Sequence, residues 1–405
     1  MLRGHLVPIS KLLLLGVLAG VLVAGPGRAA DQFDVTVTYL SREEPPLEPL
    51  SLVEPILTDE GLMGARQALG DNQTTGRFLG HNYQLVERIV PQDGDLGAAF
   101  DEALAAGERL FVSDLKKDDL LALAEQADAA GALVFNSRAE DDELRTSACF
   151  FSILHTAPSR AMMADALAQY LAWKQWTRWF LVHGSHPEDR ALAAAYQRAA
   201  TRFGAEIVET REYEDTGGAR RTDSGHVQVQ QQLPVFTQGA PEHDVLVVAD
   251  ENEVFGDYMP YRTWDARPVV GTTGLVPTSW SRVQEQWGGT QLQRRFERFA
   301  GRPMTDRDFN AWLAVRSIGE AVTRAQTNDP KALHDYLVGD QFEIAAFKGE
   351  PLTFRPWNQQ MRAPIILVTP RVLVSVSPQD QFLHQRTPLD SLGYDEPESQ
   401  CRLNG

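Results

Sequence analysis

The sequence predicts an α/β protein with two lobes, each built on a doubly wound, mostly parallel sheet. Three observations indicate this class. Short apolar runs of strand type alternate with helical patterns along most of the chain, as expected for parallel strands joined by covering helices. The alternation restarts near the middle, at residues 149–213. The chain has 405 residues, which is long for one domain and natural for two.

The first half contains four expected strands, with a helix after each of the first three. Apolar or alternating runs place the strands at 33–40, 82–90, 109–112 and 132–135. One helix is expected to start at 58–60, and apolar residues at helical spacing mark two more, through 96–104 and 120–127. Residues 41–55 are rich in Glu and Pro and are expected to form a loop.

The second half opens with a βαβ unit. Ser159 is a plausible N-cap for its first helix, and residues 179–182 suit a buried parallel strand. Residues 183–188 are expected to form a polar turn, followed by a helix that ends at Gly204 and a strand from 207.

Further elements complete the second half. A strand is expected at 244–249, and residues 268–270 and 271–276 are expected to form a further strand and turn. An exposed loop or irregular helix is expected at 216–232, a long helix capped by Thr305 and a short helix at 330–338. Residues 352–354, 365–368 and 372–376 are expected to form an antiparallel ending, and the polar tail an arm over the surface.

Residues 1–29 have the features of a secretory signal peptide. Arg3 and Lys11 accompany an apolar run at 12–24, and the small residues Gly27 and Ala29 suit cleavage after Ala29. We therefore expect export to the periplasm. The formal net charge of -17 argues against nucleic acid or an anionic membrane surface as the main partner.

The chain has two cysteines, Cys149 and Cys401. Cysteines pair in oxidising compartments, so we predict a disulfide that ties the C-terminal tail to the segment near residue 149. Two free, buried thiols are the alternative.

No familiar catalytic motif is present: there is no Gly-x-Ser-x-Gly elbow, HExxH, Walker loop or Gly-x-Gly-x-x-Gly. The turn at 183–186 contains His and Ser but no placed acid. We expect a protein that is not an enzyme and needs no cofactor.

Polar side chains gather at the predicted carboxyl ends of strands in both halves, where open α/β sheets bind ligands. Each of them also fits an ordinary polar turn. The candidate ligand-binding residues are Tyr39, Ser41, Ser113, Asn136 and Ser137 in the first half, and His183, Ser185, Asp250, Glu251, Thr272 and Thr273 in the second.

Acidic turns recur near the same ends, at 43–44, 141–143 and 250–253. Their oxygens would suit Ca²⁺ or another hard cation such as a lanthanide, although the spacing matches no EF-hand. Solvated acidic turns are the alternative reading, and no residue is assigned as a metal ligand.

The pattern at 149–213 resembles the type I periplasmic binding proteins, the Leu/Ile/Val-binding family of ABC-importer components, over about residues 33–376. The resemblance implies a two-lobed fold with a hinge of crossing segments, a small ligand between the lobes and a membrane permease as partner. It divides the chain into lobe 1 (30–150 and 278–344), lobe 2 (151–277 and 345–378) and a C-terminal arm (379–405).

A narrower resemblance rests on the runs at 248–251, 254–264, 267–271, 274–280, 285–288, 314–321, 347–349, 382–385 and 389–401. They resemble the subgroup associated with PQQ-dependent alcohol oxidation, whose quinoprotein dehydrogenases in some cases use lanthanides. This implies an importer component linked to that oxidation. The alternatives are a binding protein for Ca²⁺, a lanthanide or a metal complex, and an accessory protein of a quinoprotein dehydrogenase.

The family holds an amino acid's carboxylate with a hydroxyl and backbone amides of lobe 1, near Ser113, Asn136 and Ser137 here. Its ammonium-binding acid usually follows the strand near Gly271, where this chain has no acid, and the usual aromatic after His183 is also missing. Asp250 and Glu251 are expected to supply negative charge instead.

Overall fold

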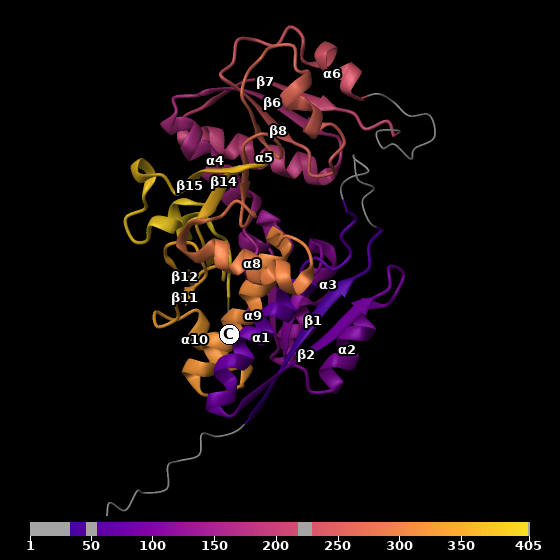
Figure 1. Ribbon diagram of the computed structural model, residues 1–405, viewed down its shortest axis with the longest axis vertical. Helices are drawn as coiled ribbons and strands as arrows, with labels where there is room; N and C mark the ends of the chain where they lie inside the picture. The colour runs from indigo at the N-terminus through magenta and orange to yellow at the C-terminus, as the bar shows by residue number, and fades with distance from the viewer. Residues whose placement is uncertain (1–32, 46–54, 218–228, 404–405) are drawn as a thin grey trace, which may run out of the picture.

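The computed structural model describes residues 33–45, 55–217 and 229–403 (Figure 1). The predicted signal peptide, most of the predicted loop at 41–55 and residues 218–228 of the segment predicted at 216–232 lie outside the described residues. The last four residues of that segment, 229–232, begin the helix Val229–Thr237. Figure 1 shows two lobes stacked along the long axis, with the yellow C-terminal part alongside their junction.

Lobe 1 is built on a parallel sheet, sheet A, with strand order β2-β1-β3-β4-β5. The strands are β1 (Phe33–Arg42), β2 (His81–Val90), β3 (Leu110–Asp114), β4 (Leu133–Asn136) and β5 (Ile153–His155). The four strands predicted in the first half are confirmed, and β5 adds a short fifth strand. Each central strand is buried along its length, as its run of apolar residues requires.

Helices cover both faces of sheet A, as the predicted doubly wound fold requires. On one face, α1 (Leu62–Leu79) and α9 (Asp306–Ala325) enclose the main core of lobe 1. On the other face lie α2 (Leu96–Ala105) and α3 (Lys117–Ala130). The lobe also contains α8 (Gly289–Ala300), α10 (Pro330–Leu337) and the small sheet of β11 (Ile344–Ala345), β12 (Pro351–Phe354) and β13 (Met361–Arg362).

Lobe 2 repeats the arrangement around sheet B, a parallel sheet with strand order β7-β6-β8-β9. Its strands are β6 (Arg178–Gly184), β7 (Glu206–Tyr213), β8 (Val245–Ala249) and β9 (Val269–Gly271). One face packs on α4 (Arg160–Trp173) and α5 (Pro187–Phe203), and the other on α6 (Val229–Thr237) and α7 (Met259–Arg262). The antiparallel sheet of β10 (Val276–Thr278), β14 (Ile365–Thr369) and β15 (Val372–Ser377) packs against α4.

Local signals read from the sequence are confirmed at several helix ends. The Ser159 and Thr305 side chains cap α4 and α9 by accepting from backbone N–H groups three residues on. Gly204 ends α5 with φ of 74°, a conformation that costs glycine little. The helix α8 was not predicted, because Leu292 and Phe296 are its only large buried apolar residues.

Among the described residues before the C-terminal arm, the chain crosses between the lobes three times. Each crossing lies between a residue of the lobe 1 core and one of the lobe 2 core: Leu154 and Met162, Leu275 and Trp280, and Met361 and Ile365. We predicted that lobe 2 starts at 151 and resumes at 345. Since β5 belongs to sheet A and residues 344–361 pack in the lobe 1 core, we propose later boundaries, near 156 and 362. Within the described part of the chain, no helix is long and apolar enough to cross a membrane.

Candidate functional site

The carboxyl ends of the two sheets come together at Arg160, the first residue of α4. Its guanidinium donates to both carboxylate oxygens of Glu251, at 2.7 Å each, and Glu251 follows β8 of sheet B. The same guanidinium lies 3.0 Å from a carboxylate oxygen of Asp141, in the loop after β4 of sheet A. We call Glu140, Asp141, Arg160 and Glu251 the interlobe cluster.

The interlobe cluster has more negative than positive charge. Burial raises the pKa of Glu140 to about 8, and the nearby carboxylate of Glu251 adds to the shift. Burial also raises the pKa of Glu251, although Arg160 opposes the change. Arg160 pairs with two of the three carboxyl groups, those of Asp141 and Glu251. Arg160 and the nearby Arg145 both favour the ionised form of Glu140, but burial outweighs them, and Glu140 takes up a proton near neutral pH. A cationic group placed beside the three carboxyl groups would be stabilised.

A second buried charge group lies at the end of β3 in lobe 1. Tyr39 Oη donates to Asp114 Oδ2 at 2.7 Å, and Arg307 Nη2 donates to the same oxygen at 2.7 Å. Burial raises the pKa of Tyr39 well above its usual range, with the Asp114 carboxylate as the next cause. Burial opposes the charge of Arg307, but Asp114 more than compensates, so the pKa of Arg307 is raised. Tyr39 and Asp114 are thus already bonded within lobe 1.

Asp250 holds the turn after β8 rather than pointing an unbonded carboxylate outward. Its two oxygens accept from the backbone N–H groups of Val254, Phe255 and Gly256, at 3.0, 2.8 and 2.6 Å. Burial raises its pKa, while these three bonds act in the opposite direction. Of the two acids expected to supply charge, Glu251 is therefore the one placed in the interlobe cluster.

Asn136 and Ser137 are both fully buried and bonded to the backbone of lobe 1. Asn136 Oδ1 accepts from the N–H of Ala139 at 2.8 Å and so shapes the loop that carries Glu140. Ser137 Oγ donates to the carbonyl of Ser113 at 3.0 Å. The hydroxyl of Ser113 is also buried, and no hydrogen-bond partner for it is found among the described residues.

The remaining candidates lie at the ends of strands or in the turns that follow them. His183 Nδ1 lies 2.7 Å from the carbonyl of Gly184, and Ser185 Oγ accepts from the N–H of Asp215 at 3.0 Å. Thr272 Oγ1 accepts from the N–H of Asp250 at 3.2 Å, which joins the ends of β8 and β9. Ser41 and Thr273 are buried at the ends of β1 and β9.

Sequence reasoning did not identify Arg160 or Arg307 as site residues. Each stands near a helix start, where a charged residue is unremarkable, and each pairs with an acid far away in the sequence: Arg160 with Glu251, 91 residues on, and Arg307 with Asp114, 193 residues back. Glu140 was also missed, although it adjoins the acidic turn at 141–143. A single sequence contains no local signal for such pairs.

The predicted disulfide is present. Cys149 and Cys401 are bonded, with their Cα atoms 5.4 Å apart. The structure also bears on the hard-cation alternative: among residues 33–45, 55–217 and 229–403, no group of three or more His, Cys, Asp and Glu side chains is placed to hold a metal ion.

The two lobes, each with a parallel sheet whose carboxyl end faces the other lobe, have the fold of the type I periplasmic binding proteins. Solved structures share this fold at low sequence identity. A periplasmic binding protein from Burkholderia mallei superposes with a TM-score of 0.65 and 14% identity over 92% of this chain and 99% of that one. A branched-chain amino acid ABC transporter periplasmic ligand-binding protein from Burkholderia xenovorans gives a TM-score of 0.69 and 15% identity, over 91% and 99%.

A third similar structure is a solute-binding protein of an ABC transporter from Rhodopseudomonas palustris in complex with 3,4-dihydroxybenzoic acid. It has a TM-score of 0.59 and 11% identity, over 83% of this chain and 93% of that one. In sequence, residues 58–224 match the family described as periplasmic binding protein. No curated protein sequence matches the chain. The resemblance to type I periplasmic binding proteins is thus confirmed in the fold and over this segment, and the narrower subgroup stays a prediction.

Proposed function

We propose that the protein is an exported solute-binding component of an ABC importer, which takes a small ligand where its two sheets meet and presents it to a membrane permease. The observation that carries this proposal is the Arg160 junction, where side chains from the carboxyl ends of sheets A and B contact one another. Ligands of open α/β sheets bind at such ends. The similar structures from B. xenovorans and R. palustris are described as binding components of ABC transporters. No covalent chemistry is required of the chain.

We further propose that the ligand has a cationic group, which lies beside the interlobe cluster. Support comes from the excess of carboxyl groups over guanidinium there and from the raised pKa of Glu140. A ligand ammonium would be stabilised by ionised Glu140 and Glu251, as a buried carboxylate is by any opposite charge. Among the predicted site residues, Ser113 is best able to form a new hydrogen bond with a ligand, because its hydroxyl has no hydrogen-bond partner in the described part of the chain.

Calorimetry with compounds of different charge tests whether the protein binds a small ligand and whether that ligand needs a cationic group. L-leucine, L-arginine and butylamine contain an ammonium group, whereas the only charged group of 3,4-dihydroxybenzoate at neutral pH is a carboxylate. We expect binding within the first group and none for the last. Affinity should rise as pH increases through about 8, because the ionised form of Glu140 favours a cation. If no compound of either charge class gives heat or shifts the melting temperature, the proposed ligand class is wrong.

A pair of variants separates the site from general charge effects. Glu251→Gln should weaken binding of the ammonium compounds by about tenfold or more, equivalent to about 1.4 kcal/mol. Glu242→Gln removes an exposed carboxylate of the same lobe, 77% accessible, and should leave affinity unchanged. Equal losses in both variants would show that the effect is not local to the interlobe cluster.

We also propose that the ligand belongs to a system of PQQ-dependent alcohol oxidation. The support is the sequence likeness of runs such as 254–264 and 389–401 to the subgroup associated with it. Affinity capture from native membranes, with cross-linking, tests the association. Recovery of permease subunits supports transport, whereas recovery of a quinoprotein dehydrogenase without a permease favours the accessory-protein alternative.

A further inference from the structure

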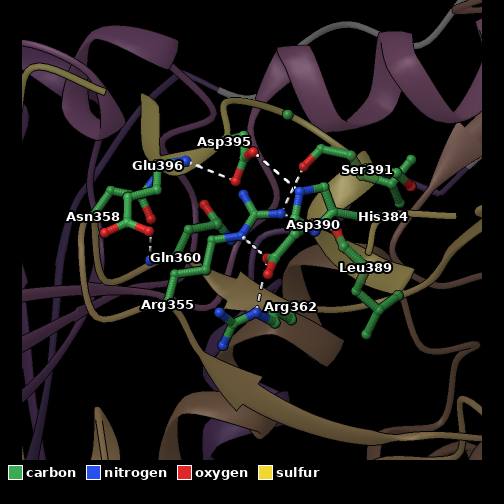
Figure 2. Close-up of polar contacts among 12 residues, drawn as sticks. Arg355, Asn358, Gln360, Arg362, His384, Leu389, Asp390, Ser391, Asp395 and Glu396 are labelled. Carbon is green, nitrogen blue, oxygen red and sulfur yellow. Dashed lines mark hydrogen bonds and ion pairs between the residues drawn. The ribbon is translucent and has the colours of Figure 1, made fainter. Parts of the chain in front are cut away.

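The C-terminal arm, described over residues 379–403, is fastened to the rest of the protein at three places. Its first anchor is at the lobe 1 end of the third crossing, where Asp390 Oδ1 accepts from Arg355 Nε, between β12 and β13, at 2.9 Å and from Arg362 Nε at 2.8 Å. Arg355 and Asp390 are almost completely buried, with side-chain exposures of 1% and 2%. Figure 2 shows Asp390 placed between the two guanidinium groups. Since a buried pair of this kind is costly to break, the anchor is firm.

The second anchor is in lobe 2. Leu392 is fully buried in the lobe 2 core. The next residue, Gly393, donates its N–H to Asp165 of α4 at 2.8 Å, and its carbonyl accepts from Arg202 of α5 at 2.6 Å. A Cβ atom at Gly393 would lie 2.7 Å from Met162 Cγ, so the arm is pressed against α4. This part of the arm therefore moves with lobe 2.

The third anchor is in lobe 1. The N–H of Gln400 donates to the carbonyl of Thr146 at 2.9 Å, and Cys401 is bonded to Cys149. Thr146 and Cys149 lie between β4 and β5 of sheet A. Only three residues before Cys401, Glu398 still pairs with a residue of lobe 2, Arg198, at 3.3 Å. The arm thus contacts lobe 2 up to Glu398 and is fixed to lobe 1 immediately afterwards, at residues 399–401.

We propose that residues 388–401 act as a strap that restricts the movement of the two lobes, with the Cys149–Cys401 disulfide as its lock on lobe 1. The three backbone crossings alone leave the hinge free to bend, as in hinge-type closure generally. The strap is a fourth connection, and it is covalent at its far end. It narrows the range of lobe angles and so favours one arrangement of the interlobe cluster. The inference concerns the movement itself and holds whatever the ligand is.

Single-molecule fluorescence transfer between the lobes tests the strap in the full-length mature protein without ligand. Dyes are attached through p-azidophenylalanine in place of Phe78 on α1 and Tyr261 on α7, which are 88% and 84% exposed. The wild-type disulfide form is compared with Cys149→Ser/Cys401→Ser. We expect the double variant to show a broader distance distribution, with the open population raised about tenfold, which corresponds to about 1.4 kcal/mol of restraint.

Hydrogen exchange on the same proteins shows whether the disulfide restricts the movement of the lobes or stabilises only the residues beside it. A strap predicts faster exchange both near residues 146–150 and 399–403 and at residues 355–365, which contain Arg355 and the third crossing. If exchange increases only beside the two serines and the distance distribution is unchanged, the proposal is overturned. Glu396→Gln, which breaks an exposed ion pair of the arm, is the matched control and should match the wild type. If the double variant does not fold, Cys401→Ser and in-place reduction of the labelled wild type provide the same comparison.

Discussion

Lys348 is a buried amine without a carboxylate partner among the described residues, and it leads to a specific prediction about stability and pH. It is 2% exposed, and its ammonium group donates to the carbonyl of Ser279. The rings of Phe309 and Trp280 lie 5.1 and 5.9 Å from Nζ. Burial lowers the pKa of Lys348 to about 7, and no charged neighbour contributes to the shift. The folded protein therefore disfavours the charged form of this side chain.

The sign of the effect follows from proton binding in the two states. Below about pH 7 both the folded and the unfolded chain hold the proton on Lys348, so the destabilisation caused by burying this charge does not change with pH. Between about pH 7 and the ordinary lysine pKa near 10.5, only the unfolded chain holds it, so stability rises with pH. With these two pKa values, the contribution of Lys348 to the free energy of unfolding increases by about 2 kcal/mol between about pH 7 and 9.

Denaturant unfolding of the wild type and Lys348→Met, each at pH 7 and pH 9, measures this contribution. The change in the free energy of unfolding between the two pH values is compared between the two proteins. Methionine has a similar length and no charge, so the variant should be more stable at pH 7 and should lose the rise of about 2 kcal/mol. Comparison with the wild type cancels other groups that titrate in this range, such as Glu140. Lys331→Met, at an exposed lysine of α10, should keep the wild-type rise. The same pH dependence in Lys348→Met and the wild type would refute the reasoning.

Further predictions concern the C-terminal arm and are checked by denaturant unfolding at pH 7. Asp390→Asn should cost about 3 kcal/mol, because Arg355 would stay buried without its carboxylate. Glu396→Gln removes only an exposed ion pair of the same arm and should cost less than about 1 kcal/mol. Gly393→Ala should cost about 1–3 kcal/mol, since its φ is 78° and the new Cβ would crowd Met162. An Asp390→Asn cost no larger than that of Glu396→Gln, or wild-type stability in Gly393→Ala, would contradict these expectations.

The fold was predictable because its signals are local. A run of apolar residues predicts a buried strand at 179–182, and β6 is found at Arg178–Gly184. The caps Ser159 and Thr305 precede helical patterns directly, and a count of two cysteines leaves one possible disulfide. The helix α8 was not predicted, although Leu292, Phe296 and Ala300 recur at helical spacing on one face of a mostly polar segment.

The chemistry of the candidate site was much less predictable. Position at a strand end was correctly inferred for Asp250 and Glu251, yet only the structure distinguishes the acid that bonds its own turn from the acid that pairs across the lobes. The difference depends on Arg160, about 90 residues away, whose direction cannot be read from neighbouring residues. Lys348 is a stronger case, since a lysine in the sequence is ordinarily expected at the surface.

The strap and the interlobe cluster are connected through one residue, Arg145. Its side chain is 1% exposed and donates to the carbonyls of Ala139 and Asp141, at 2.8 and 3.0 Å. These two carbonyls flank Glu140, so Arg145 holds the acidic loop of the cluster in place. The carbonyl of Arg145 itself accepts from Ser399 of the strap at 3.3 Å.

The same guanidinium also reaches the first crossing and Gln360, the residue just before the third. It donates to the carbonyl of Ala157 at 3.0 Å and to the side chain of Gln360 at 2.9 Å. A buried guanidinium cannot lose one of these acceptors without finding another, because an unpaired buried donor is costly. Ser399 of the strap contacts the backbone carbonyl of the same residue, Arg145. Hydrogen bonds made by Arg145 therefore join the loop that carries Glu140 to Ala157 in the first crossing, to Gln360 and to the strap.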